Sequence, residues 1–366
     1  MRIAVDAREL APHPTGVGRY LLEILQAWAR DPAAADCDVT LWSPTELDLA
    51  SPRLRGAGAR IEGRVLPGSG GTAWEQLRLP FALLNGADVI FAPAYSAPVF
   101  ATAPTVLTIH DVSFFAHPEW FGRREGQRRR WTCRLAAANA AMVLTDSAFS
   151  RDEIVGRVGV APARVRVTPL GVSARVRPLV SGPRDDAAPL VLYVGTQLNR
   201  RNLPDLVRAF APLARADARA RLVIVGENRT FPRQDPIAVA RDLGLAGAVD
   251  VRPWVSDDEL TALYGRATTF AWLSTYEGFG LPPLEAMAAG VPVVAYDTAV
   301  AREVYDTAAT LVQVGDVEAV TAALVALATD PGRREAHRDA GRRQVARFDW
   351  TRTAQATLAA LREAAR

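Results

Sequence analysis

The sequence predicts an α/β protein built from two doubly wound, Rossmann-like domains. Short runs rich in Val, Ile and Leu alternate with helical stretches along the 366 residues. Uninterrupted apolar runs of this kind are typical of parallel strands that helices cover on both faces. A polar stretch with Gly and Pro, 181–186, divides the runs into two sets. A chain of this length corresponds to about two domains of ordinary size.

Each set of apolar runs predicts one sheet. The first set comprises Ile3–Val5, Val39–Trp42, Ile61–Leu66, Val89–Ala92, Val106–Ile109, Met142–Thr145 and Val165–Val167. The second comprises Leu190–Val194, Leu222–Val225, Val249–Val251, Thr269–Leu273, Val291–Ala295 and Leu311–Val314. We expect the first domain over residues 1–175 and the second over 186–349.

The last segment, 350–366, reads as a helix with Ala354, Leu358 and Leu361 on one apolar face. We expect this helix to cross back onto the first domain. An ordinary terminal helix of the second domain fits the same pattern.

Composition excludes several classes of protein. Apolar residues make up 49% and charged residues 23%, which is ordinary for a globular chain and excludes a disordered or collagen-like one. The net charge of +3 is too small to indicate a nucleic-acid-binding protein. Two cysteines are too few for a disulfide framework or a zinc site. The chain contains no lysine, so any site that needs a cation must use arginine.

No segment of the sequence favours a secretory leader or a membrane span. Asp6 interrupts the first apolar run, and Pro93, Pro98 and Pro104 interrupt the longest uncharged stretch, 89–109. We therefore expect a soluble, cytoplasmic protein, with peripheral contact at the inner face of a membrane left open.

Candidate ligand-binding residues follow the predicted strands, because doubly wound sheets bind ligands at the carboxyl ends of their strands. The most informative segment is 276–290, in which Glu277, Gly278 and Gly280 form a loop. Glu285 is expected in the first turn of the following helix. Free amides beside two carboxylates suit a polyhydroxylated ligand that carries phosphate. The alternative for Glu285 is a plain charge near a helix start.

A second polar turn follows the run Leu190–Val194. Gly195 ends the strand, Arg200 and Arg201 occupy the turn, and Asn202 is a plausible cap for the next helix. Paired guanidinium groups at a helix start suit a diphosphate. A solvated pair of surface arginines is the alternative.

Two weaker signals lie in the first half. Gly16 and Gly18 open a helix after the first strand, but Leu21 breaks a dinucleotide-binding G-x-G-x-x-G pattern, and a tight turn is the alternative. His110 ends a buried strand, where a structural histidine is the alternative to a catalytic one.

Together these segments resemble glycosyltransferase family 4, whose members have the GT-B fold, with two Rossmann-like domains facing each other across a cleft. The resemblance extends over nearly the whole chain. Glu277 and Glu285 match the E-x7-E signature of that family, and 190–203 resembles its donor-phosphate turn. The segments 117–119 and 277–288 look most like bacterial mannosyltransferase-type members.

The resemblance implies a retaining transfer of a hexose from a nucleotide sugar, with no metal or other cofactor. GDP-mannose is the first candidate donor. A saccharide or lipid-linked acceptor in surface polysaccharide or glycoconjugate synthesis is the expected partner. Glu285 would hold the ribose, and Glu277 with the amides of 278–281 would hold the donor sugar and phosphate. The family usually has lysine where Arg201 stands.

The resemblance implies a catalytic set and a donor-binding set. The catalytic set is His110, Arg200, Arg201 and Glu277. The donor-binding set is Gly16, Gly18, Gly195, Thr196, Gly226, Trp254, Val255, Gly278, Phe279, Gly280, Leu281 and Glu285. The only D-x-D string, 36–38, precedes a strand and therefore lies at the wrong end of the sheet for a metal site.

Several alternatives stay open. A UDP-sugar-dependent transferase, a nucleotide-sugar epimerase of the same fold and a non-catalytic nucleotide-sugar-binding relative share these motifs. The arginines of 123–134, interleaved with aromatic residues, fit either an anionic membrane surface or a solvated helix face. The arginine-rich stretch 333–347 is expected to be a solvated helix face.

Overall fold

The computed structural model describes residues 1–366 except 11–15, 49–53, 84–85 and 174–187. The chain forms two compact units. The first comprises Met1–Pro118, Arg123–Gly171 and Asp349–Arg366, and the second comprises Glu119–Gly122 and Val172–Phe348. The predicted boundaries at 175 and 186, and the predicted linker 181–186, lie outside the described residues.

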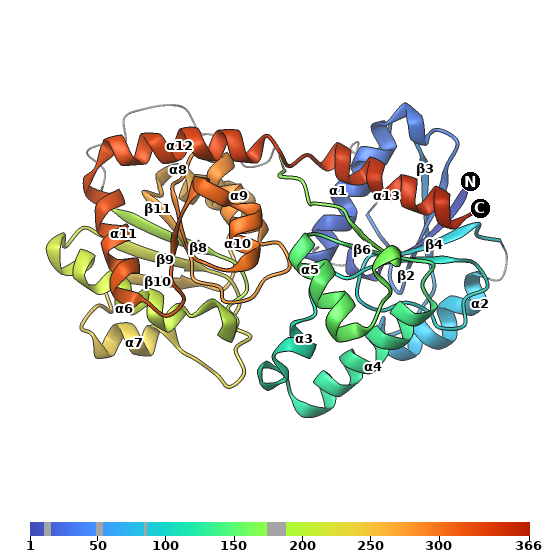
Figure 1. Cartoon of the computed structure of the whole chain (residues 1–366), viewed down its shortest axis with the longest axis horizontal. Helices are drawn as coiled ribbons and strands as arrows, with labels where there is room; N and C mark the ends of the chain where they lie inside the picture. Colours follow the sequence, from blue (N-terminus) through green and yellow to red (C-terminus); the bar gives the residue numbers. More distant parts are fainter. Residues whose placement is uncertain (11–15, 49–53, 84–85, 174–187) are drawn as a thin grey trace. The chain divides into compact units, whose positions relative to one another are not determined.

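The first unit contains a seven-stranded parallel sheet in the order β3-β2-β1-β4-β5-β6-β7 (Figure 1). Its strands are β1 (Arg2–Asp6), β2 (Asp38–Ser43), β3 (Arg60–Val65), β4 (Val89–Ala92), β5 (Thr105–Thr108), β6 (Met142–Thr145) and β7 (Val165–Val167). Each predicted run of the first set overlaps one of them. Central β4, β5 and β6 are buried along their whole length, which explains their uninterrupted apolar sequences.

Helices connect these strands. They are α1 (Val17–Arg30), the π-helical turn η4 (Trp74–Arg78), α2 (Leu79–Leu83), α3 (Ser113–Ala116), α4 (Arg123–Asn139), α5 (Ala148–Glu153) and the last helix, α13 (Trp350–Ala364). The crossovers between parallel strands are right-handed by rule. The chain passes from β1 to β2 in one direction along the sheet, and from β3 to β4 and β5 to β6 in the other. Helix α1 therefore covers one face, and η4, α2 and α4 cover the opposite face.

The second unit contains a six-stranded parallel sheet in the order β10-β9-β8-β11-β12-β13. Its strands are β8 (Leu190–Val194), β9 (Arg221–Val225), β10 (Val249–Arg252), β11 (Thr269–Trp272), β12 (Val293–Tyr296) and β13 (Ala309–Val312). Its helices are α6 (Leu203–Ala216), α7 (Pro236–Asp242), α8 (Asp257–Arg266), α9 (Leu281–Ala288), α10 (Ala299–Val304), α11 (Val317–Thr329) and α12 (Pro331–Val345).

Each sheet has one point where the strand order reverses. In the first unit this point lies between β1 and β4, and in the second between β8 and β11. Loops that leave neighbouring strands in opposite directions open a crevice at such a point, and ligands of doubly wound sheets bind there. The fold therefore places the loops after β8 and β11 at the expected ligand edge of the second unit.

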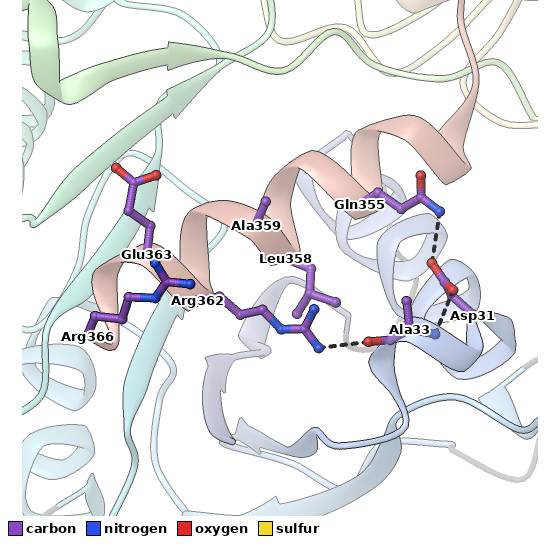
Figure 2. A pocket seen from close by; sticks show the side chains of 8 residues that line it. All are labelled: Asp31, Ala33, Gln355, Leu358, Ala359, Arg362, Glu363 and Arg366. Atoms are coloured by element: carbon purple, nitrogen blue, oxygen red, sulfur yellow. Dashed lines mark hydrogen bonds between the residues drawn. The ribbon is translucent and has the colours of Figure 1, made fainter.

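Helix α13 packs against α1 within the first unit, and the two helices lie side by side (Figure 1). The indole of Trp28 donates a hydrogen bond to the carbonyl oxygen of Ala354 at 2.8 Å. Leu358 and Leu361 are buried in this contact. A cavity of about 420 Å³ lies beside α13, lined by residues that include Asp31, Leu358 and Arg362 (Figure 2).

The arginine-rich helix α12 is only partly the solvated face that the sequence predicts. Arg334 is 4% exposed and donates to the carbonyl oxygens of Leu327 and Ala328, which lie in the last turn of the preceding helix. Gln344 is also buried and donates to the carbonyl oxygen of Val304. These side chains bond backbone carbonyls that would otherwise lack partners. Among the described residues, no helix is long and apolar enough to cross a membrane.

Replacing Leu361 with alanine should destabilise the first unit by about 2–5 kcal/mol, because this side chain on α13 is fully buried. Arg352→Ala, an exposed change on the same helix, should leave stability nearly unchanged. Urea unfolding followed by circular dichroism measures both. Equal effects of the two substitutions would contradict the docking of α13.

Candidate active site

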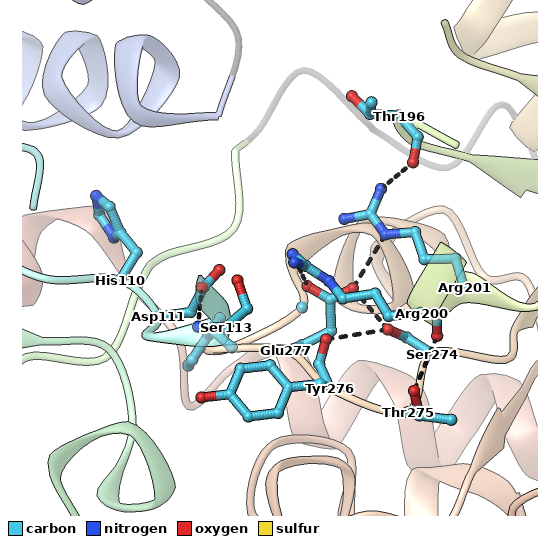
Figure 3. A network of polar contacts seen from close by, with 12 residues as sticks. His110, Asp111, Ser113, Thr196, Arg200, Arg201, Ser274, Thr275, Tyr276 and Glu277 are labelled. Carbon is cyan, nitrogen blue, oxygen red and sulfur yellow. Dashed lines mark hydrogen bonds and ion pairs between the residues drawn. The ribbon is translucent and has the colours of Figure 1, made fainter. Parts of the chain in front are cut away.

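A buried ion-pair cluster joins the loops after β8 and β11. Arg200 and Arg201 lie in the short turn η8 (Asn199–Arg201), and Glu277 lies in the loop after β11. The Nε of Arg201 donates to Oε1 of Glu277 at 3.0 Å, and Nη2 of Arg200 lies 3.5 Å from Oε2 (Figure 3). The backbone N–H of Thr275 also donates to the carbonyl oxygen of Arg200 at 2.8 Å. The structure thus brings together three of the four predicted catalytic residues.

The guanidinium group of Arg201 is held on several sides. It lies 4.5 Å from the centre of the Trp272 ring, and its Nη1 donates to the carbonyl oxygen of Thr196 at 2.6 Å. Nη1 also lies 3.4 Å from the Tyr193 hydroxyl. A lysine ammonium has neither the planar face nor the separated donors that these contacts use. Arginine at this position therefore has its own supporting environment.

Burial and charge act in opposite directions on Glu277. The side chain is 7% exposed, and burial alone would raise the pKa of its carboxyl. The positive charges of Arg201 and Arg200, with hydrogen bonds from Arg201 and Ser274, outweigh burial and lower that pKa. Glu277 is therefore anionic at neutral pH and has no proton to give as a general acid.

Tyr305 supports the glycine loop that follows Glu277. Gly280 has φ +83°, in the left-handed region, and it precedes α9 directly. The hydroxyl of Tyr305 donates to the carbonyl oxygen of Gly280 at 2.9 Å, and a Cβ at Gly280 would lie 2.0 Å from that hydroxyl. With its carbonyl held by Tyr305, Gly280 has both a backbone and a packing reason to be glycine.

Glu285 lies on α9 but not in its first turn, contrary to the sequence-based expectation. It is the fifth residue of the helix Leu281–Ala288, because the helix begins at Leu281 after the left-handed Gly280. Its side chain is half-buried. The favourable effect of the helix dipole on an anion is confined to the first turn, so the dipole does not explain this carboxylate.

Two further predicted donor-binding glycines lie where backbones approach closely. A Cβ on Gly226 would lie 2.1 Å from the carbonyl oxygen of Gly195, so neither loop has room for a side chain there. The N–H of Gly195 donates to the carbonyl oxygen of Val225, and the N–H of Gly226 donates to the carbonyl oxygen of Arg252. These bonds continue the hydrogen bonding between β8, β9 and β10 past the ends of the strands. These glycines bring the loops together at one edge.

Trp254 and Val255 follow β10, at the same end of the sheet but two strands away from β8. The indole of Trp254 is 76% exposed, whereas Val255 is buried. Neither side chain has a described contact with the Glu277 cluster. Their assignment to donor binding remains a prediction.

His110 belongs to a separate polar group in the first unit. Its Nδ1 lies 2.7 Å from a carboxylate oxygen of Asp146, and its Nε2 lies 3.1 Å from the carbonyl oxygen of Pro93. Both partners are acceptors, so the doubly protonated ring fits both. Burial opposes the charge, but the Asp146 carboxylate outweighs burial and raises the pKa of His110. The ring also lies edge-on to Tyr20, with centroids 4.7 Å apart.

The other predicted residues of the first unit lie at the start of α1. Gly16 precedes the helix and is exposed, and Gly18 is buried in its first turn. The sequence analysis missed a neighbouring cluster at the reversal point between β1 and β4. There Arg8 lies 3.0 Å from Asp6 and also pairs with Glu75. Burial raises the pKa of Asp6 to about 6, although Arg8 lowers it.

Sequence reasoning also missed Ser274 and Tyr305. Ser274 donates to Glu277 at 2.8 Å, and its place directly after a strand was an available signal. Tyr305 follows α10, far along the chain from the loop that it supports, and carries no local signal. Asn202 is not a side-chain cap as predicted. Its left-handed backbone, with φ 48°, turns its amide toward the carbonyl oxygen of Leu273 at 2.9 Å.

Two family profiles match the chain, one on each half. The profile of "Glycosyltransferase Family 4" matches residues 14–176, and that of "Glycosyl transferases group 1" matches residues 180–344. The chain belongs to this family of glycosyltransferases. Of the two glutamates that match the family signature, Glu277 lies in the buried cluster described above and Glu285 lies half-buried on α9.

Relatives and solved structures agree with this assignment. The "O-antigen chain mannosyltransferase B" of Escherichia coli is 29% identical over 291 residues, covering 77% of this chain and 76% of that protein. The "MMP alpha-(1->4)-mannosyltransferase" of Mycolicibacterium hassiacum is 30% identical over 250 residues, covering 67% and 58%.

Among solved structures, sucrose-phosphate synthase from Thermosynechococcus elongatus has a TM-score of 0.76 at 21% identity, over 99% of this chain and 98% of that one. Anabaena HepE, solved with UDP and glucose, has a TM-score of 0.73 at 20% identity, over 98% of each chain. At about 20% sequence identity, these structural similarities show the fold alone. The glycosyltransferase has the GT-B fold, as the sequence predicted.

Alanine at Gly280 should destabilise the second unit through two separable effects. The left-handed backbone costs about 1–2 kcal/mol for any side chain, and the Cβ collides with the Tyr305 hydroxyl. Tyr305→Phe removes the collision but not the backbone cost, so Gly280→Ala should cost less in that background. Thermal unfolding of the double-mutant cycle measures the difference.

Gly244→Ala is the matched control, because Gly244 has φ +72° but open space around its Cβ position. It should show the backbone cost alone and no coupling with Tyr305→Phe. Additive effects of Gly280→Ala and Tyr305→Phe would show that a Cβ at residue 280 does not collide with the Tyr305 hydroxyl.

Asp146→Asn should lower the pKa of His110, because the Asp146 carboxylate is the largest of the influences that oppose burial. In the wild type, the raised pKa means that His110 stabilises the fold fully below about pH 6.5. That contribution is lost as pH rises through the folded-state pKa. NMR titration of the four histidine rings measures these values.

His337, whose pKa is lowered by burial in the second unit, is the internal control and should not move. An unchanged His110 titration in the variant would show that Asp146 does not set its charge.

Proposed function

We propose that this glycosyltransferase moves a hexose from a nucleotide sugar to a saccharide or lipid-linked acceptor, with retention of anomeric configuration and without a metal. The observation that carries the proposal is the Arg200, Arg201 and Glu277 cluster beside the glycine loop 278–281. Cations and amides lie next to a fixed carboxylate at the reversal point of a doubly wound sheet. That donor set suits a sugar diphosphate.

In the proposed reaction, the bond between the sugar and the diphosphate breaks and its electron pair stays on phosphate. The acceptor hydroxyl forms the new bond to the sugar, and its proton passes to a phosphate oxygen of the departing diphosphate. Negative charge therefore grows on the diphosphate, and Arg200 and Arg201 would stabilise it. Because Trp272 and Thr196 already orient Arg201, little reorganisation is needed when the charge appears.

Glu277 would bind hydroxyls of the donor sugar rather than transfer a proton. Its lowered pKa keeps it anionic, and its bonds to Arg201 and Ser274 fix its direction. A hydrolase with paired carboxylates would need one of them protonated. Glu285 would hold the ribose.

GDP-mannose is the first candidate donor, and two relatives that carry mannosyltransferase names support it. A UDP-sugar is the second candidate, because HepE of the same fold was solved with UDP and glucose. The E. coli relative is named for O-antigen chains, which supports a role in surface polysaccharide or glycoconjugate synthesis.

A nucleotide panel of UDP, GDP, ADP and dTDP should show which base the glycosyltransferase binds. A ligand at about a hundred times its dissociation constant adds about 2.7 kcal/mol, which shifts the melting temperature by several degrees. One nucleotide should stabilise the wild type, and Glu285→Ala should lose most of that shift. Glu318→Ala, an exposed carboxylate on α11, should keep it.

The matching sugar nucleotide should then be incubated with saccharide acceptors. NMR should show that the new linkage has the same anomeric configuration as the sugar in the donor. Activity that persists in EDTA supports metal independence. A changed sugar on the nucleotide without any acceptor would indicate an epimerase. Nucleotide binding without turnover across the acceptor panel would favour a non-catalytic relative.

A further inference from the structure

The exposed apolar side chains of the first unit are unevenly distributed. Among its described residues, the large hydrophobic side chains that are exposed lie on β3, η4, α2, α4 and the loop after β4. They are Val65 (50% exposed), Leu77 (63%), Phe81 (72%), Phe100 (80%), Trp131 (68%) and Leu135 (42%). None lies on α1 or α13, which cover the opposite face of the sheet. Scattered single residues need no explanation, but this concentration on one layer does.

Hydrogen bonds connect the elements that carry these side chains. Arg128 of α4 donates to the hydroxyl of Thr72, two residues before η4, at 3.0 Å. Gln76 of η4 donates to the carbonyl oxygen of Ala97 at 2.9 Å and accepts from the N–H of Val99 at 3.0 Å, next to Phe100. The helices and the loop therefore form one connected layer. We call its exposed part the η4–α4 face.

The η4–α4 face is strongly basic. The exposed charged residues on η4, α2 and α4 are Arg78, Arg123, Arg124, Arg128, Arg134 and a single acid, Glu125. Glu125 forms an ion pair at 2.6 Å with Arg129, and Arg129 is half-buried. The face therefore presents an excess of positive charge around exposed aromatic rings.

The structure also divides the arginine-rich segment that the sequence singled out. Arg130 donates to the carbonyl oxygen of Phe114, and Arg134 lies 4.8 Å from the Phe115 ring centre, so these two arginines also support α3. Phe114 itself is buried. Trp131 points outward instead, and Phe81 and Phe100 join it from parts of the chain that the sequence analysis did not connect.

We propose that the η4–α4 face binds the surface of an anionic lipid bilayer. Arginines near such a surface attract its phosphate groups, and tryptophan and phenylalanine insert at the boundary between headgroups and acyl chains. The excess of cations selects anionic lipid over a neutral membrane. A lipid-linked acceptor would then lie in the same bilayer that the first unit contacts.

The test is sedimentation of the full chain with vesicles of phosphatidylcholine alone or mixed with phosphatidylglycerol. The protein should bind only the anionic vesicles, and less as salt rises. Arg123→Gln with Arg124→Gln should weaken binding about 25-fold, since each arginine contributes about fivefold near an anionic surface. Phe81→Ser with Trp131→Ala should also weaken it.

Matched controls lie in the second unit. Arg342→Gln with Arg343→Gln removes two exposed cations from α12, and Phe231→Ser removes an exposed ring. Both should bind vesicles like the wild type. Circular dichroism confirms that each variant is folded, and because every changed side chain on the face is exposed, we expect no loss of stability.

Three results would overturn the proposal. They are no binding to anionic vesicles at low salt, equal loss in the control variants, and self-association of the wild type that Phe81→Ser with Trp131→Ala abolishes in light scattering. The last would assign the face to a protein partner instead. Vesicle binding needs neither donor nor acceptor, so its failure would leave the proposed transfer reaction untouched.

Discussion

The buried pairing of Glu277 with Arg200 and Arg201 is the constraint on which the ligand edge of the second unit depends. It ties the loop after β8 to the loop after β11 across the point where the strand order reverses. A buried carboxylate is costly unless charges and hydrogen bonds compensate it, so each member of the cluster requires the others. The cluster therefore fixes the direction of both arginines before any ligand arrives.

The absence of lysine has a structural consequence at this edge. Arg201 fills a position where the family usually has lysine, and its planar group lies over Trp272 while its donors reach Thr196 and Glu277. Stacking and forked hydrogen bonding are properties that an ammonium lacks. The neighbours of Arg201 thus suit arginine in particular, and in the proposed reaction this preoriented cation would stabilise the departing diphosphate.

Much of the fold followed from local pattern. The apolar runs predicted the strands of both sheets, because buried parallel strands need uninterrupted apolar sequence. The position of Glu277 after a strand also followed. The support from Tyr305 did not, since nothing in the segment near 305 indicates a partner in the glycine loop. Glu285 was placed one turn too early, because the left-handed Gly280 sets where α9 begins.

The sequence by itself determined the two-sheet architecture, the family and the residues at the strand ends, because these depend on short-range periodicity and on motifs contiguous along the chain. Only the tertiary structure decided which side chains meet. The docking of α13 on α1, the pairing of His110 with Asp146 and the gathering of Phe81, Phe100 and Trp131 on one layer all join distant segments. Such contacts arise from strand order and helix packing, which no local window of sequence contains.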